Sequence, residues 1–223
     1  MAPIAVGLPM TQRAFYSTTL RTQNKAKMDA IASKYRSELD QAQRLTNVPR
    51  TLALSVIFAE SAGQASVISS AGAVGLMQLK PQTANDVIYL EYRAGRLSPS
   101  EMNLLRQKLG NKLDGPLKQK YLAHRIKENS FTGNALTRAD LLDPGLNILL
   151  GCMYLGILMD QHQEGGTLRM DKVILRYNQG YFFKIPAGDV ERTLDYAKVK
   201  SKEAYAYALK MIGKNGLLEI QAT

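Results

Sequence analysis

The spacing of apolar and polar residues along this chain predicts a mainly α-helical protein. From Lys27 to Leu45, apolar side chains recur at three- and four-residue intervals, the period of one helix face. Asn47-Val48-Pro49 interrupts this pattern, and proline suits the first turn of a following helix. That second helix, through Ala59, is apolar on nearly every side, so we expect it to be buried.

The second half of the chain continues in helices. A third apolar helix is predicted from Asp143 to Met159, and Gly165-Gly166 then breaks the chain. Further helices are expected from about Leu168 to Tyr177 and from about Val190 to Ile212. Strand-like alternation is rare and no repeat is evident, so the predicted fold class is mainly α.

Two segments lack this regular pattern. Residues 1–26 lack helical periodicity and carry no acidic residue, and are predicted to form a flexible N-terminal arm before one globular domain over residues 27–223. Residues 88–140 form a basic helical insert, with ten Lys or Arg against five Asp or Glu from Glu91 to Asp140. Glycine and proline interrupt its helical pieces.

The charge of the chain narrows the partner class without choosing one. The formal net charge is +10 and the sequence pI is about 9.6, so we expect an anionic partner. Nucleic acid, acidic membrane surfaces and acidic cell-wall polymer all satisfy that expectation. The single cysteine, Cys152, excludes an internal disulfide, and with only His124 and His162 no metal site is expected.

No membrane span and no secretion signal are expected. The longest apolar run, Ile148 to Met159, has 12 residues, whereas a spanning helix needs about 20. Residues 1–10 are apolar but lack a preceding basic region and contain Pro3 and Pro9. The sequence therefore predicts a soluble protein, which would depend on another route if it acts outside the cytoplasm.

One carboxylate stands out from its surroundings. Glu60 ends the apolar second helix, and Lys80 is the only charged residue between it and Asp86. Burial disfavours the charged form of a carboxyl group, so we expect the pKa of Glu60 to be raised, as a general acid requires. The alternative interpretation is a helix-end glutamate turned to solvent.

Four segments share their order with a known family. They are Glu60-Ser61 with residues 69–81, then residues 143–155, then residues 165–180 with Tyr177-Asn178, and finally residues 193–199. Together they resemble the motifs of soluble lytic transglycosylases, which belong to the goose-type lysozyme superfamily. The interval from Glu60 to Gln78 matches the family spacing without a gap.

The resemblance implies a fold and a role for each matching residue. It implies a lysozyme-like helical catalytic domain with a central cleft, acting on peptidoglycan glycan strands in the periplasm or cell wall without a cofactor. Glu60 would donate a proton and then act as the base. The other implied substrate-binding residues are Ser69 and Gln78 in the cleft, Tyr177 and Asn178 against the saccharide, and Tyr196 on the floor near Glu60.

The family mechanism needs only one protein carboxylate. Glu60 would protonate the leaving oxygen, the substrate N-acetyl group would stabilise the cation, and a 1,6-anhydro end would form. We interpret Asp86, Asp143 and Asp195 as capping or surface groups rather than as a second catalytic acid.

Alternatives remain open at this stage. A hydrolase on the same fold would use water instead of the sugar hydroxyl, and a virion or secretion-apparatus component would need no activity. Delivery by a phage particle, a holin or a secretion system fits the expected lack of a signal. No nucleic-acid partner is expected, because no helix-turn-helix or zinc signature accompanies the charge.

Overall fold

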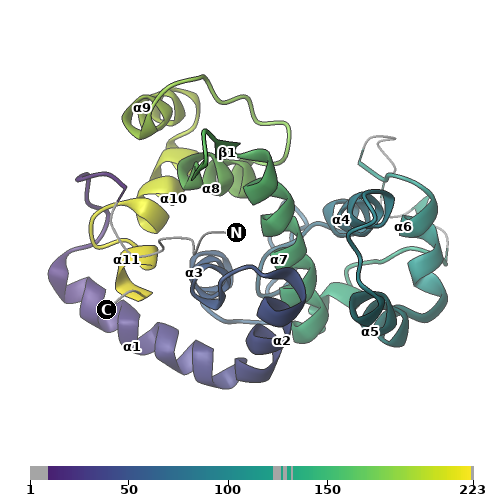
Figure 1. Cartoon of the computed structure of the whole chain (residues 1–223). Coiled ribbons are helices and arrows are strands. Elements are labelled where there is room, and N and C mark those ends of the chain that lie inside the picture. Colours follow the sequence, from purple (N-terminus) through teal and green to yellow (C-terminus); the bar gives the residue numbers. More distant parts are fainter. Residues whose placement is uncertain (1–9, 123–126, 128–129, 132, 222–223) are drawn as a thin grey trace. The chain divides into compact units, whose positions relative to one another are not determined.

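The computed structural model describes residues 10–122, 127, 130, 131 and 133–221, and these residues divide into two compact units (Figure 1). Unit 1 comprises residues 1–34, 49–59 and 158–223, and unit 2 comprises residues 35–48 and 60–157. The described chain is mainly helical, which confirms the predicted fold class.

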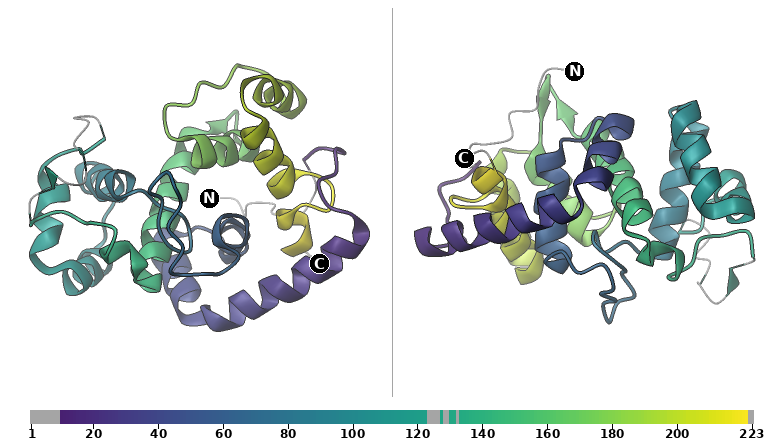
Figure 2. Two further views of the ribbon diagram at one scale, coloured as in Figure 1. Left: turned by 180° about the vertical axis from the view of Figure 1, so that it is seen from behind. Right: turned by 90° about the horizontal axis from the view of Figure 1, so that it is seen from below.

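Unit 1 is built from helices on a small apolar core. Helix α10 packs on α8 and α9, while α11 packs on α10 and α1. Both views of Figure 2 show α11 beside the long α1. The elements that lie wholly in this unit are α1 (Thr18–Lys34), β1 (Gln163–Glu164), β2 (Thr167–Leu168), α8 (Met170–Gln179), α9 (Val190–Lys200), α10 (Lys202–Ile212) and α11 (Leu217–Gln221).

In unit 1, helical structure begins earlier in the chain than the hydrophobic pattern predicts. Helix α1 begins at Thr18 rather than near Lys27. Ahead of it, residues 10–16 form a strap on the same unit: the Met10 N–H donates to the Ile212 carbonyl at 2.9 Å. Arg13 pairs with Glu191 at 2.7 Å. The helix and these contacts occupy residues 10–26 of the predicted arm, and residues 1–9 lie outside the described residues.

Unit 2 carries the helices of the middle of the chain. Helix α4 packs on α6, and α5 packs on the short helix η1. Ser98 starts α5 with a capping box, in which its hydroxyl accepts from the Glu101 N–H. The elements are α2 (Arg36–Thr46), α4 (Pro81–Arg93), α5 (Pro99–Leu109), η1 (Gly110–Leu113), α6 (Asp114–Lys118) and η3 (Asp140–Leu142).

The two strongly apolar helices are confirmed. They are α3 (Arg50–Ser61) and α7 (Pro144–Gln161), and both are buried over most of their length. Within the described residues, no helix is long and apolar enough to cross a membrane. The apolar run of α7 therefore belongs to the core, as predicted.

Two predicted helices are each divided into two. Tyr35 separates α1 from α2, and its buried side chain points its hydroxyl at the Gly63 carbonyl, 3.2 Å away. Ser201 separates α9 from α10: its backbone is extended, and its hydroxyl accepts the Ala204 N–H as an N-cap. In both places a side-chain hydrogen bond accompanies the break in a continuous apolar pattern.

Candidate active site

Glu60 lies in the last turn of α3 and is half-buried. The preceding turns contain fully buried Leu52, Val56 and Ile57, so the helix itself is held in the core. The helix ends because Ala62 and Gly63 take positive φ angles of 50° and 81°. The carboxylate therefore stands where a rigid helix gives way to a loop.

Ser61 fastens the start of that loop, which spans residues 62–80. Its buried hydroxyl donates to the Leu76 carbonyl at 2.8 Å and accepts the Gly63 N–H at 3.2 Å. The hydroxyl of Tyr35, the residue just before α2, donates a hydrogen bond to the Gly63 carbonyl. The residue after Glu60 thus joins the helix end to the far part of the loop, 15 residues later in the chain.

Ser69 and Gln78, the two predicted binding residues in this loop, brace its turns. The Ser69 hydroxyl accepts the Ala73 N–H at 3.0 Å. The Gln78 side-chain amide donates to the carbonyls of Val67 and Gly75, at 3.1 Å and 2.9 Å. Gln78 also has a positive φ of 47°. Both side chains are half-buried. Each therefore stabilises the loop and still exposes part of its surface.

Asn147 on α7 fixes the loop to this buried helix through hydrogen bonds. This role was not predicted from the sequence. Its side chain is fully buried and accepts the Met77 N–H at 2.8 Å. It also donates to the carbonyls of Val74 and Leu141, both at 2.9 Å. A Cβ on Gly75 would lie 2.5 Å from the Asn147 amide nitrogen, so only glycine allows this approach. A buried amide in an apolar helix was the available signal.

The three remaining predicted residues lie in unit 1. Tyr177 and Asn178 lie in the last turn of α8, where Tyr177 is buried and the Asn178 side-chain oxygen accepts from the Gln179 side-chain amide at 2.7 Å. Tyr196 is half-buried on α9, with its ring 6.2 Å from that of Phe183. Glu60, Ser69 and Gln78 are thus grouped in unit 2, and Tyr177, Asn178 and Tyr196 in unit 1.

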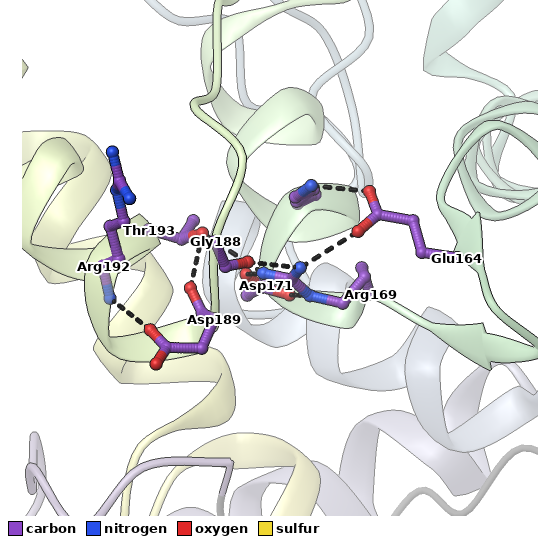
Figure 3. Close-up of polar contacts among 8 residues, drawn as sticks. Glu164, Arg169, Asp171, Gly188, Asp189, Arg192 and Thr193 are labelled. Carbon is purple, nitrogen blue, oxygen red and sulfur yellow. Dashed lines mark hydrogen bonds and ion pairs between the residues drawn. The ribbon is translucent and has the colours of Figure 1, made fainter.

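A polar network fixes the segment between α8 and α9 (Figure 3). Arg169 forms two hydrogen bonds with the fully buried Asp171, at 2.9 Å and 2.6 Å, and donates to the Gly188 carbonyl at 2.6 Å. It also pairs with Glu164 at 3.1 Å. The hydrogen bond that Lys172 donates lowers the pKa of Glu164, and the hydrogen bonds that Arg169 donates to Asp171 raise the pKa of Arg169. We did not anticipate this network from the sequence.

Of the three acids that we interpreted as capping or surface groups, Asp143 caps a helix and Asp195 lies at the surface, whereas Asp86 accepts from a distant part of the backbone. The Asp86 carboxylate accepts the Tyr121 N–H at 2.5 Å. Asp143 accepts the Leu146 N–H in the first turn of α7, at 2.6 Å. Asp195 pairs with Arg13 at 2.8 Å, a hydrogen bond that lowers its pKa. All three carboxylates therefore have partners within the chain.

Comparison with known proteins shows what the chain is similar to. Residues 38–104 match the model of the Transglycosylase SLT domain, a stretch that contains Glu60, Ser69 and Gln78. The mainly helical architecture agrees with the lysozyme-like fold of that domain. The predicted resemblance to soluble lytic transglycosylases is therefore confirmed.

A named relative agrees with this class. The chain is similar to membrane-bound lytic murein transglycosylase C of Mannheimia succiniciproducens, with 28% identity over 165 residues. The matched residues are 74% of this chain and 34% of the relative, so the match spans about a third of the relative's length.

Proposed function

We propose that this chain cleaves the glycan strands of bacterial peptidoglycan as a lytic transglycosylase, acting at the cell wall. The observation that carries the proposal is the place of Glu60. It is a half-buried carboxylate at the end of a buried helix, inside the stretch that matches the SLT domain, and it is followed by a braced loop. A proton donor in glycoside cleavage needs such a rigid mount.

Glu60 would act first as acid and then as base. Its proton passes to the oxygen of the β-1,4 bond between N-acetylmuramic acid and N-acetylglucosamine, and the bond from C1 to that oxygen breaks. The substrate's N-acetyl oxygen stabilises C1. The Glu60 carboxylate then takes the proton of the muramyl C6 hydroxyl while O6 bonds to C1. Glu60 regains its proton, and the product is a 1,6-anhydro end.

Three further acids are already hydrogen-bonded or ion-paired, which supports a mechanism with one protein carboxylate. Asp86, Asp143 and Asp195 are occupied by backbone N–H groups or by Arg13. A carboxylate held in this way is poorly suited to activate water as the second catalytic group. Substrate assistance supplies what a second acid would otherwise do.

The binding roles follow from the hydrogen-bonding capacity that the loop leaves in place. Gln78 donates its amide hydrogens to the loop, so its carbonyl oxygen is the atom that would meet the sugar or Glu60. Ser69 accepts from the loop, which leaves its hydroxyl hydrogen to donate to the sugar. The resemblance also implies saccharide contacts for Tyr177, Asn178 and Tyr196.

Mass spectrometry of muropeptides released from purified sacculi tests this function. We expect fragments with 1,6-anhydro-muramyl ends, each lighter by one water than the reducing form. A predominance of reducing ends would favour a muramidase that keeps Glu60 as its acid. The absence of released fragments at any enzyme concentration would favour a non-enzymatic role.

A further inference from the structure

Phe182 presents its ring to solvent on the segment between α8 and α9, with 71% of the residue exposed. It belongs to an aromatic cluster, which we define as Tyr181, Phe182, Phe183 and Tyr196. The rings of Tyr181 and Phe182 meet edge to face at 5.1 Å, and Phe183 and Tyr196 lie 6.2 Å apart. The cluster therefore joins the segment to α9 while one ring stays outside.

The segment that carries the exposed ring is anchored on both sides. On one side, the Gly180 N–H donates to the Arg176 carbonyl at 2.8 Å, and Gln161 donates to the Tyr181 hydroxyl at 2.5 Å. On the other side, Arg169 holds the Gly188 carbonyl within the network of Figure 3. An apolar ring on an anchored segment is pre-organised for a ligand, because little conformational freedom remains to be lost on binding.

One lysine lies over a ring of the cluster, and two more lie near it in the chain. The Lys200 ammonium lies 5.7 Å from the centre of the Tyr196 ring, and that of Lys198 lies 5.8 Å from the Tyr205 ring. Lys184 follows Phe183 directly in the chain, and all three lysines are exposed. The two acids of α9, Glu191 and Asp195, are engaged by Arg13. The surface thus combines aromatic faces with positive charge.

Peptidoglycan has the complementary chemistry. The C–H faces of a sugar ring pack on aromatic rings, and the carboxylates of the peptide stems are attracted to ammonium groups. We propose that the aromatic cluster, with Lys184, Lys198 and Lys200, is a further binding surface for a glycan strand and its acidic stems. This inference rests on the proposed function and extends it to Phe182 and the segment between α8 and α9.

The test measures binding of the full chain to purified sacculi in a Glu60→Gln background, which keeps the wall intact. We expect Phe182→Ala to weaken binding roughly three- to tenfold, the loss of one aromatic contact. Phe182→Tyr should restore binding, because the ring returns. The matched control is Phe15→Ala, since Phe15 is also exposed and also meets a tyrosine edge to face, Tyr16 at 4.8 Å. An equal loss in that control would mean that any exposed aromatic ring promotes nonspecific binding, and it would overturn the proposal.

Sacculi stripped of their peptide stems separate the two chemistries. The Phe182→Ala loss should persist on stem-free glycan, whereas the loss from Lys198→Gln with Lys200→Gln should appear only on intact wall. A Phe182 effect that disappears with the stems would contradict sugar stacking. Unchanged binding by Phe182→Ala, while the protein with native Glu60 still cleaves sacculi, overturns this inference alone. If that protein neither binds nor cleaves sacculi, the proposed function fails as well.

Discussion

Asn147 accepts the backbone N–H of Met77 at 2.8 Å, across 70 residues of sequence. With its bonds to the carbonyls of Val74 and Leu141, this one amide satisfies three buried backbone groups. The loop that follows Glu60 is thereby fixed on α7. We interpret Asn147 as a positioning residue for the loop that carries Ser69 and Gln78.

Replacing this amide should cost stability and activity together. Asn147→Ala leaves three buried backbone groups without their partner, so we expect a loss of about 3–5 kcal/mol in the free energy of unfolding. Chemical denaturation measures the loss. The folded fraction should also show a lower kcat on sacculi, because the loop is no longer held.

Asn85 offers a matched control for that experiment. It is also fully buried in unit 2, donates to the carbonyls of Pro81 and Leu136, and accepts the Leu136 N–H. Asn85→Ala should therefore lose similar stability with kcat unchanged. An equal fall of kcat in both variants would mean that Asn147 acts through general stability only.

His162 should make stability depend on pH near neutrality. Burial first, and then the positive charges of Arg176 and Lys172, lower its pKa from 6.5. The unfolded chain then binds more protons, so this stabilisation is present above about pH 6.5 and is lost as the pH falls towards the folded-state pKa. The melting temperature should drop between pH 7.5 and pH 5.

A glutamine variant isolates this effect. His162→Gln should flatten the fall in melting temperature between pH 7.5 and pH 5. Acids with lowered pKa, such as Asp140 and Asp143, lose their contribution only below about pH 5. An unchanged slope in His162→Gln would contradict the assignment.

The basic insert is predicted to draw the protein to anionic wall polymer. Several of its cations already have acid partners: Arg96 with Glu91, Arg106 with Asp114, Lys108 with Asp143 and Lys112 with Asp140. Lys118 is exposed, and Lys120 lies 5.6 Å from the Tyr89 ring. Substituting these last two lysines leaves the ion pairs intact.

We therefore expect Lys118→Gln with Lys120→Gln to weaken sacculus binding at low salt. The difference should vanish near 1 M salt, where the Debye length is about 3 Å. Turnover of a short soluble glycan should stay unchanged. As a control, Lys27→Gln with Lys34→Gln removes the same amount of positive charge from α1, which lies outside the insert. An equal effect there would assign the attraction to net charge rather than to the insert.

How much of the fold could be predicted from the sequence depends on whether the interactions that stabilise each feature are local or long-range. The buried helices α3 and α7 were predictable because continuous apolar runs are a local signal. The breaks at Tyr35 and Ser201 were not, because one depends on a carbonyl 28 residues away and the other on a single hydroxyl. The Arg169 network was also missed, since its contact with Gly188 joins residues that only the fold brings together.

For the candidate site, family spacing located the residues but not their local tasks. The bracing bonds of Gln78 depend on a positive φ, which the sequence does not indicate for a glutamine. The grouping of Glu60, Ser69 and Gln78 in one compact unit follows from their short separation in the chain. The contribution of Tyr177, Asn178 and Tyr196 to the same site stays a prediction.

The most direct test of the central claim is the rate of lysis of purified sacculi by Glu60→Gln. The substitution removes the transferable proton and keeps the size of the side chain. We expect lysis to fall by about 10²–10⁴-fold, the contribution of a positioned acid, with an unchanged helical circular-dichroism spectrum. Lysis within a few-fold of the unmodified protein would contradict the assignment of Glu60 as the catalytic carboxylate.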